Sequence, residues 1–499
     1  MPMRVAFLAA ECEPWAKTGG LADVVDALAR ALGRLDGDAI GTPVDVFLPR
    51  YRAVPDPVTV ESATVLEVPD PRSPSGHSPV TVIDVPAGGY RLRLIDYPAA
   101  FDREGFYGDA TGDYADNAWR FGLFCRAALE ALRADDRPLD LLHLHDWHTG
   151  PAAIFRDGRY ADDPVIGRAA ILMTLHNLAY HGWTTRSSLP QLGLAPGDGI
   201  VPAGADGIDL LRAGIERAEL VNTVSPGFAA EALTPAFGMG LDGTLREMGD
   251  RFVGILNGLD NAVWDPSADP DLAAPYSRAN LAGKSTCRAD LLTRVGFVSA
   301  DPGPVIGMIG RLDPQKGFDL LSDAAPALLE RGIRLIVQGS GDPALAGPFR
   351  ALAAANPERV SLIERFDRAM ARRIYAGADF FVMPSRFEPC GQGQMIALRY
   401  GTPPIVHRTG GLADTVIDET TSPGHGTGFS FQGATVDGLV GACETAVGLH
   451  RHGGPAWAGL LGRGMAVDFD WTTGSAPRYL DAYRRAIAIR ARRRSAEDV

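Results

Sequence analysis

Short apolar runs alternate with amphipathic stretches along almost the whole chain. In the first half, apolar runs of strand length occur at residues 5–10, 44–48, 80–85, 90–95, 139–145, 169–175 and 220–224. Helical patterns at 21–32 and 116–132 lie between them, and the first places Leu21, Val24, Val25, Leu28 and Leu32 on one face. Alternating strands and helices predict parallel strands joined by right-handed crossovers. The glycine-rich stretch 193–207 is predicted to be a long surface loop.

The same alternation starts again in the second half of the chain. Predicted strands lie at 305–309, 333–338, 360–363, 378–383 and 404–407, and predicted helices at 318–329 and 476–490. A length of 499 residues exceeds what one hydrophobic core usually organises. The turn Asn257-Gly258, after the apolar run 252–256, marks the crossing between the halves. We therefore predict an α/β protein of two doubly wound halves with a central cleft between them.

Composition excludes several classes of partner. The net charge of −13 argues against nucleic acid, whose phosphates would be repelled. The five cysteines are scattered, without a Cys-x-x-Cys pair, which fits a reducing cytosol. The N-terminal apolar run is too short for a signal peptide, and no run approaches the roughly 18 apolar residues of a membrane span. We expect a cytoplasmic protein with no nucleic-acid or membrane partner.

A polar, glycine-containing stretch follows the predicted strand 378–383. It runs from Ser385 to Gln394 and precedes a predicted helix. Open α/β sheets bind ligands outside the carboxyl ends of their strands. There, Glu388 is placed to accept sugar hydroxyls while the N–H groups of Gly391 to Gly393 face an anion. The alternative is an ordinary turn with an exposed glutamate, and from this stretch alone that alternative is preferred.

Two further loops combine glycine with positive charge. Lys17-Thr18-Gly19-Gly20 joins a strand to a helix, which is the geometry that presents backbone amides to phosphate, although a full dinucleotide or Walker pattern is missing. After the first strand of the second half, Arg311 can bind phosphate bidentately and Lys316 adds a compact charge. The alternative for this second loop is a solvated surface. Its place at a strand's carboxyl end favours phosphate binding.

Histidines gather near the ends of two predicted strands. His143, His145 and His148 lie within six residues, and the first two share a strand face, which raises the alternative of a zinc site. No further ligand is apparent nearby, and Trp147 favours a surface on which a sugar stacks. His176 ends the strand 169–175, where a hydrogen-bonded rim residue is the ordinary interpretation. We expect no metal.

Together these motifs resemble the glycogen/starch synthase family. The matching segments, in the order of the family, are 17–24, 145–148, 176–180, 257–260, 315–317 and the stretch around Glu388, and the resemblance spans about residues 3–485. It implies a GT-B fold with two Rossmann-like domains, an acceptor-side domain at 1–252 and a donor-side domain at 253–468. It also implies a helix at 469–490 that returns to the first domain. The basic end 491–499 is predicted to be a flexible tail.

The resemblance implies a retaining glucosyltransferase. It would transfer glucose from ADP-glucose, the usual donor of bacterial relatives, to the non-reducing 4-hydroxyl of an α-1,4-glucan such as glycogen, without a metal or other cofactor. Arg311 and Lys316 would hold the diphosphate, Glu388 would accept hydroxyls of the donor glucose, and His176 would lie beside the anomeric carbon. The other nucleotide-sugar contacts would come from Lys17, Gly19, Gly20, Phe366, Gly391, Gln392 and Gly393. The sugar side of the cleft would be lined by Asp23, Asp146, Trp147, Asn177, Asn257 and Gln315.

Three positions depart from the family pattern. Gln392 stands where the family usually has Leu, and Phe366 and Phe101 stand where tyrosines are expected, so two hydroxyls are lost. None of these changes removes a charged participant. Two alternatives remain open: a GT-B transferase that acts on a small acceptor such as glucose 1-phosphate, and a catalytically silent glucan-binding homologue.

Overall fold

The computed structural model describes residues 2–35, 39–40, 43–194, 207–297 and 303–497. Most of the predicted surface loop 193–207 lies outside these residues. Internal packing divides the chain into two compact units. Unit 1 comprises residues 1–224, 229–258 and 471–499, and unit 2 comprises residues 225–228 and 259–470. Each unit contains its own sheet.

The sheet of unit 1 has nine strands within the described residues, in the order β13-β12-β9-β8-β1-β2-β5-β4-β3. They are β1 (Val5–Leu8), β2 (Val44–Pro49), β3 (Ser62–Pro69), β4 (His77–Ala87), β5 (Tyr90–Asp96), β8 (Leu141–His145), β9 (Ala170–Leu175), β12 (Leu220–Thr223) and β13 (Phe252–Gly254). Every pairing from β13 to β5 is parallel. β1 pairs with β2 on one side and with β8 on the other. The direction in which successive strands are added to the sheet therefore reverses between β1 and β8.

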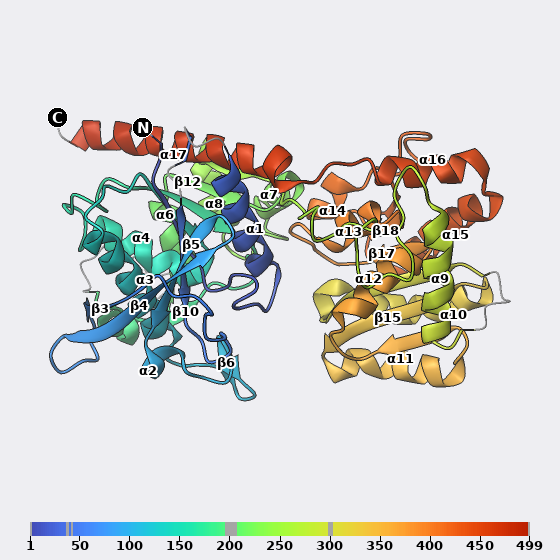
Figure 1. The fold of residues 1–499 in the computed structure, drawn as a ribbon, viewed down its shortest axis with the longest axis horizontal. Helices are drawn as coiled ribbons and strands as arrows, with labels where there is room; N and C mark the ends of the chain where they lie inside the picture. The colour runs from blue at the N-terminus through green and yellow to red at the C-terminus, as the bar shows by residue number, and fades with distance from the viewer. Residues whose placement is uncertain (1, 36–38, 41–42, 195–206, 298–302, 498–499) are drawn as a thin grey trace. The chain divides into compact units, whose positions relative to one another are not determined.

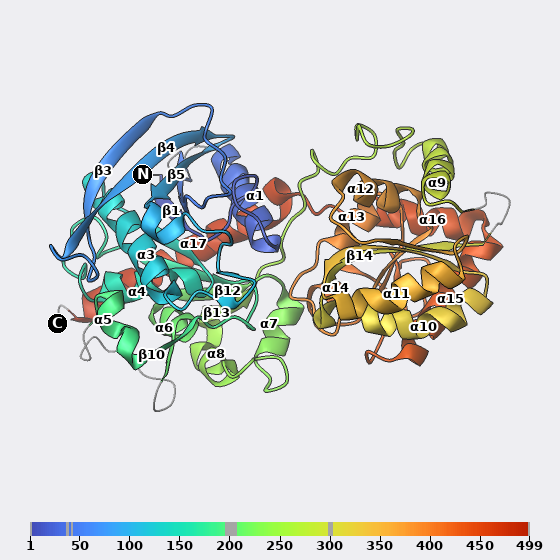
Figure 2. The same cartoon turned by 90° about the horizontal axis from the view of Figure 1, so that it is seen from below.

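Two strands of unit 1 depart from the predicted parallel pattern. β4 pairs antiparallel with β5, and β3 pairs antiparallel with β4 at the sheet edge. β3 was not predicted, because most of its side chains are exposed and no apolar run marks it. Figure 2 shows these strands at one side of the unit.

The helices of unit 1 surround this sheet. They are α1 (Gly20–Arg34), α2 (Pro98–Phe101), α3 (Asn117–Ala134), α4 (Gly150–Asp157), α5 (Leu189–Leu192), α6 (Leu210–Arg217), α8 (Asp242–Met248), α17 (Ala476–Glu497) and most of α7 (Pro226–Ala232). Small hairpins pair β6 (Gly108–Asp109) with β7 (Gly112–Asp113) and β10 (Trp183–Thr185) with β11 (Gly207–Asp209). In α1 the predicted apolar face is buried, which confirms the helical pattern. The 3-10 helix η1 (Trp147–Thr149) follows β8.

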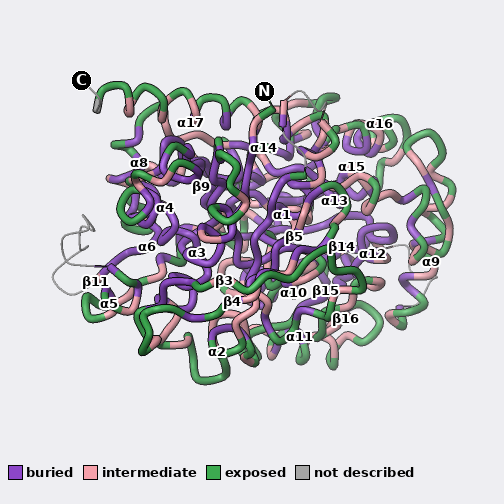
Figure 3. The backbone as a smooth tube through the Cα atoms, turned by 60° about the vertical axis from the view of Figure 1, so that its left-hand side comes forward, coloured by how far each residue is buried: buried purple, intermediate pink, exposed green. Residues whose placement is uncertain are grey.

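The C-terminal helix α17 packs on unit 1 through one face. Its residues Ala476, Tyr479, Tyr483 and Ala486 are buried, at the spacing of one helix face. The helix lies against β8, β9 and β12, and its outer side is exposed (Figures 1 and 3). It continues to Glu497, so the segment from residue 491 that was predicted to be a flexible tail is helical instead. The pairing of Arg493 with Glu219 at 3.4 Å helps to hold this end.

Unit 2 contains a fully parallel sheet, with the strand order β16-β15-β14-β17-β18-β19 in the described residues. The strands are β14 (Val305–Leu312), β15 (Arg334–Gly341), β16 (Val360–Ile363), β17 (Phe380–Met383), β18 (Pro404–His407) and β19 (Phe429–Phe431). From β14 the chain proceeds outward through β15 to β16, then returns to β17 and proceeds the other way. The direction therefore changes between β14 and β17.

Helices cover both faces of the unit 2 sheet. They are α9 (Ala282–Arg294), α10 (Phe318–Glu330), α11 (Pro343–Ala355), α12 (Arg368–Gly377), α13 (Gly393–Arg399), α14 (Gly410–Thr415), α15 (Val436–His452) and α16 (Gly454–Gly464). Ile306 packs into the core on the side of α10, α11 and α15, while the neighbouring Val305 packs on the side of α9 and α12 (Figure 2). This two-sided burial is why the strands appear in the sequence as continuous apolar runs. No helix among the described residues is long and apolar enough to cross a membrane.

Candidate functional site

The topology of unit 2 brings two predicted loops together. β14 and β17 are neighbouring parallel strands, and the chain changes direction between them. Arg311 lies near the carboxyl end of β14, and the stretch that contains Glu388 follows β17. Such a switch point leaves a crevice at the carboxyl ends of the strands, where open α/β sheets bind ligands.

Lys316 and Glu388 form the centre of this half-site. Lys316 Nζ lies 2.6 Å from Glu388 Oε2, and Ser385 Oγ donates to the same oxygen at 3.1 Å. Glu388 is only 5% exposed. The alternative of an ordinary turn with an exposed glutamate is therefore wrong, because this carboxylate is buried and bonded to a cation.

The two loops are also joined through their backbones. Gln315 Nε2 donates to the carbonyl of Phe387, and the N–H of Arg386 donates to the carbonyl of Gln315. Gly317, with φ of +71°, ends the 3-10 helix η4 (Pro314–Lys316), and a Cβ there would lie 2.3 Å from the carbonyl oxygen of Pro384. Glycine is thus required for the close approach of the loops. Gln315 was predicted to bind substrate, but its side-chain amide N–H and its backbone carbonyl are hydrogen-bonded to the stretch that contains Glu388.

Other predicted groups of unit 2 remain open to a ligand. The side chain of Arg311 is 53% exposed, and its recorded carboxylate partner, Asp313, is 4.0 Å away. The ring of Phe366 is 79% exposed and therefore accessible to a ligand. Gly391, Gln392 and Gly393 are half-buried and lead into α13.

In unit 1, Glu11 organises the loop that was predicted to bind phosphate. Its buried carboxylate accepts hydrogen bonds from the N–H of Thr18 at 2.6 Å, from the N–H of Gly19 at 3.1 Å and from Tyr107 Oη at 2.7 Å. The Gly19 N–H is therefore already bonded to protein, which corrects the expectation that it faces a phosphate. Glu11 was not predicted, since a glutamate directly after a strand carries no distinguishing sequence signal.

The remaining groups of this loop stay accessible. Lys17 is exposed and its Nζ lies 2.6 Å from Asp23 Oδ1. A Cβ added to Gly19 or Gly20 would meet nothing within 4 Å, and Gly19 has an extended backbone with φ of −154°. Neither close packing nor backbone conformation therefore requires glycine at these two positions.

The ends of β8 and β9 place Asp146 beside His176. Asp146, which has φ of +56°, accepts a hydrogen bond from the backbone N–H of His176 at 2.7 Å. Burial raises the pKa of Asp146 to about 7. His176 Nε2 lies 3.0 Å from His145 Nδ1, and desolvation lowers the pKa of His176 to about 3, so its ring is neutral at pH 7.

Three other predicted positions differ in their surroundings. Asn257 is buried, and its Oδ1 has no hydrogen-bond partner in the described part of the chain. Asn177 is half-buried beside His176. Trp147 is only 8% exposed, and a Cβ at Gly182 would lie 2.3 Å from its ring. The expected open stacking surface is therefore wrong for this indole, which is buried against Gly182.

Phe101, predicted to replace a tyrosine in a cleft, is fully buried. Its ring packs edge-on against Tyr51 at 5.9 Å and beneath the Arg120 guanidinium. Its contribution is to the core of unit 1.

The zinc alternative has no support among the described residues. They contain no group of three or more His, Cys, Asp or Glu arranged to hold a metal ion. Both ring nitrogens of His143 are bonded to protein hydroxyls, those of Tyr483 and Thr174.

Comparison with known proteins identifies the family. Residues 4–247 match the starch synthase catalytic domain, and residues 303–447 match the glycosyl transferases group 1. The chain is 38% identical to the glycogen synthase of Syntrophotalea carbinolica, over 98% of this chain and 99% of that one. It is 41% identical to the glycogen synthase of Anaeromyxobacter dehalogenans, over 97% and 99% of the two chains. The chain belongs to the glycogen/starch synthase family.

Solved structures agree with this assignment. The catalytic domain of starch synthase IV from Arabidopsis thaliana, bound to ADP and acarbose, is 34% identical and has a TM-score of 0.88, over 98% of this chain and 100% of that one. A sucrose-phosphate synthase from Thermosynechococcus elongatus, 20% identical with a TM-score of 0.60, supports the fold alone. The predicted GT-B fold and the predicted glycogen synthase function, that of a hexosyltransferase, are confirmed. The roles of single residues stay predictions.

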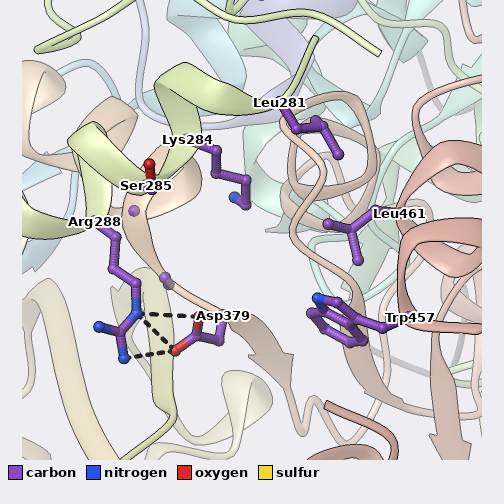
Figure 4. A pocket seen from close by; sticks show the side chains of 9 residues that line it. Leu281, Lys284, Ser285, Arg288, Asp379, Trp457 and Leu461 are labelled. Atoms are coloured by element: carbon purple, nitrogen blue, oxygen red, sulfur yellow. Dashed lines mark hydrogen bonds and ion pairs between the residues drawn. The ribbon is translucent and has the colours of Figure 1, made fainter. Parts of the chain in front are cut away.

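A separate cavity of this glycogen/starch synthase homologue lies at the opposite, amino end of β17. Its volume is about 210 Å³. Nine residues line it, among them Lys284, Arg288, Asp379, Trp457 and Leu461. Figure 4 shows Arg288 directed at Asp379 and Trp457 across the cavity. Lys284 Nζ already donates to three oxygens, and burial lowers the pKa of Lys284 to about 8. The ammonium of Lys284 is thus fully hydrogen-bonded to protein, and Arg288 and Asp379 form an ion pair with each other. We therefore assign the cavity no part in the reaction.

Proposed function

We propose that unit 2 binds ADP-glucose through Arg311, Lys316, Glu388 and Phe366. The observation that carries this proposal is the Lys316–Glu388 pair at the carboxyl ends of β14 and β17. A cation beside a carboxylate offers one group for the diphosphate and one for the glucose hydroxyls. The exposed ring of Phe366 is suited to stack on the adenine base, and Gly391, Gln392 and Gly393 complete the donor contacts.

The chemistry follows from the placement of these charges. The bond between C1 of glucose and the diphosphate breaks, and C1 forms a bond to the 4-hydroxyl oxygen at the non-reducing end of an α-1,4-glucan. Negative charge grows on the departing ADP, where Arg311 and Lys316 stabilise it. We propose that the acceptor's proton passes to a phosphate oxygen of the leaving ADP, which permits attack from the same face and retention of configuration. No metal is needed for this account.

Unit 1 is proposed to supply the remaining substrate contacts. Lys17 and Gly20 would bind the donor, with Gly19 leaving room for it. The neutral ring of His176 would bind next to the anomeric carbon by hydrogen bonding without adding charge. Asp23, Asp146, Asn177 and Asn257 would bind sugar hydroxyls, and the unpartnered Oδ1 of Asn257 supports this role. Trp147 and Gln315 would act by supporting the loops.

The cellular setting is part of the same proposal. None of the five cysteines, all within the described residues, forms a disulfide, which suits the reducing cytoplasm. We propose that the protein acts there on a nucleotide sugar and glycogen, with no nucleic-acid or membrane partner.

The test is transfer of labelled glucose into glycogen, from ADP-glucose and separately from UDP-glucose, with a chelator present. Incorporation from ADP-glucose that exceeds incorporation from UDP-glucose and survives chelation is expected. Preference for UDP-glucose, or loss of transfer on chelation, would overturn the donor or the metal-free account. Transfer to glucose 1-phosphate but not to glycogen would establish the small-acceptor alternative. Donor binding without transfer to either acceptor would establish the silent homologue.

A further inference from the structure

The ring of His145 lies between that of His176 and a buried polar network around His143 in unit 1. Both His143 and His145 are fully buried on β8, and their rings lie 4.1 Å apart between centroids. His143 Nδ1 lies 3.0 Å from Tyr483 Oη, and His143 Nε2 lies 2.6 Å from Thr174 Oγ1. His145 touches this network by ring packing alone, and its printed side-chain hydrogen bond goes to His176, the ring beside the proposed substrate.

The direction of the hydrogen bonds around His143 can be derived. Asn222 Nδ2 lies 3.4 Å from the carbonyl of Thr223 and 3.2 Å from Tyr479 Oη, which places its Oδ1 toward Thr174. An amide oxygen only accepts, so the Thr174 hydroxyl donates to Asn222 Oδ1 at 2.7 Å. Thr174 Oγ1 must then accept from His143 Nε2–H. Desolvation lowers the pKa of His143 far below its usual value, so the ring is neutral and its Nδ1 accepts from Tyr483.

The same reasoning gives the tautomer of His145. Its Nδ1 lies 3.0 Å from His176 Nε2, while its own Nε2 is buried and has no partner among the described residues. A proton on Nε2 would leave a buried N–H unpaired, whereas a proton on Nδ1 leaves only a lone pair unpaired. Orphaned buried N–H groups are the rarer of the two. His145 Nδ1–H therefore donates to His176 Nε2.

This bond determines which edge of His176 carries its proton. A neutral imidazole has one N–H, so a ring that accepts at Nε2 is protonated at Nδ1. No hydrogen bond to His176 Nδ1 is recorded within the described ranges, and the residue is half-buried. That N–H is available to donate to a hydroxyl or to an oxygen of the leaving group.

We propose that His145 is a positioning residue, which fixes His176 as the Nδ1–H tautomer and turns that N–H toward the reacting sugar. The proposal rests on the proposed function for the sugar contact, but the tautomer itself does not. The backbone of His176 is fixed separately by Asp146, so the bond from His145 acts on the orientation of the ring. Removal of the bond would free the ring to rotate and to exchange tautomers.

The direct test is nitrogen NMR of the full chain with ¹⁵N-labelled histidine, recorded without substrate. The signals of His176 are assigned by their loss in the His176→Gln variant. We expect the Nδ1–H pattern in the wild type and a mixture of both tautomers in His145→Phe, which keeps a flat ring against His143 and removes both nitrogens. An Nε2–H pattern for His176 in the wild type would overturn the proposal.

Kinetics test the consequence for the reaction. In His145→Phe we expect kcat to fall by about 100-fold, with KM for ADP-glucose changed by less than about threefold, because ring misplacement affects the transition state more than donor binding. In His145→Asn, whose amide can donate from near the Nδ1 position, we expect partial recovery of kcat. His425→Phe, at an exposed histidine of unit 2, should match the wild type.

The outcomes separate this proposal from simpler explanations. Equal losses in the Phe and Asn variants, or an unchanged kcat in His145→Phe, would overturn it. If the Phe variant fails to fold, the nitrogen spectrum of His145→Asn provides the second measurement, because its amide can donate to His176 Nε2 in place of the imidazole. The Nδ1–H pattern of His176 is expected to persist in that variant, and an Nε2–H pattern for His176 there would overturn the proposal. Failure of the wild type to transfer glucose would refute the proposed function and leave the NMR result intact.

Discussion

Lys316 Nζ and Glu388 Oε2 lie 2.6 Å apart, although 72 residues separate them in the chain. The pair joins a loop after β14 to a loop after β17, and Glu388 is almost fully buried. A buried ion pair is weak evidence for stability, because desolvation offsets much of its attraction. We propose instead that the pair, at the switch point of the sheet, binds charged and polar groups of the substrate.

The first prediction concerns Glu388. We expect Glu388→Ala to lower kcat by at least about 100-fold, because the acceptor for the donor's hydroxyls is lost where the transition state forms. Glu388→Gln keeps the shape and one acceptor oxygen, and should retain more activity than the alanine variant. Circular dichroism should show that both variants fold. Turnover of Glu388→Ala within a few-fold of the wild type would refute this role.

The second prediction concerns the proposed diphosphate contact. Lys316→Ala should weaken ADP binding and lower kcat together, because the ammonium attracts the phosphates in both the ground state and the transition state. Isothermal titration with ADP and steady-state kinetics measure the two effects. Arg350→Ala removes an exposed charge that pairs with Glu364 and should leave both unchanged. ADP affinity that is equal in Lys316→Ala and the wild type would remove Lys316 from the phosphate site.

The sequence predicted the loops at the carboxyl ends of several strands because two local signals coincide there. Buried parallel strands such as β9 and β17 are continuous apolar runs, and polar residues follow them, His176 directly after β9 and Glu388 in the loop after β17. The edge strand β3 lacks the first signal, since its side chains are mostly exposed. It was missed for that reason.

Contacts between distant segments could not be predicted from the sequence. Tyr483 bonds to His143 across 340 residues, and no local pattern marks either as a partner. Glu11 holds the Lys17 loop only because folding brings Tyr107 and two loop amides to its carboxylate. Likewise, the burial of Trp147 depends on the close approach of Gly182. Local pattern located the loops, but tertiary packing determined which groups in them remain available to substrate.

The third prediction uses the unexplained glycine at the start of α1. Because a Cβ at Gly20 meets nothing within 4 Å, Gly20→Ala should fold normally and gain up to about 1 kcal/mol of stability from its higher helix propensity. Activity should nevertheless fall, because the methyl group occupies space proposed for the donor. Thermal unfolding and glucose transfer are measured on the same preparation. A variant that is both stable and fully active would show that the donor does not approach this position.

The last prediction concerns the pH dependence of stability and the buried Asp146. Burial raises the pKa of Asp146 in the folded chain to about 7 from its ordinary value of 3.8, so the folded state binds more protons than the unfolded state between these values. Stability from this group is fully present below pH 3.8 and is lost as pH rises through 7. Asp146→Asn removes the titration but keeps an oxygen that can accept from the backbone N–H of His176. We expect the free energy of unfolding of the variant, relative to the wild type, to increase from pH 5 to pH 8 in urea titrations. A constant difference across that range would mean that Asp146 is not held at a raised pKa.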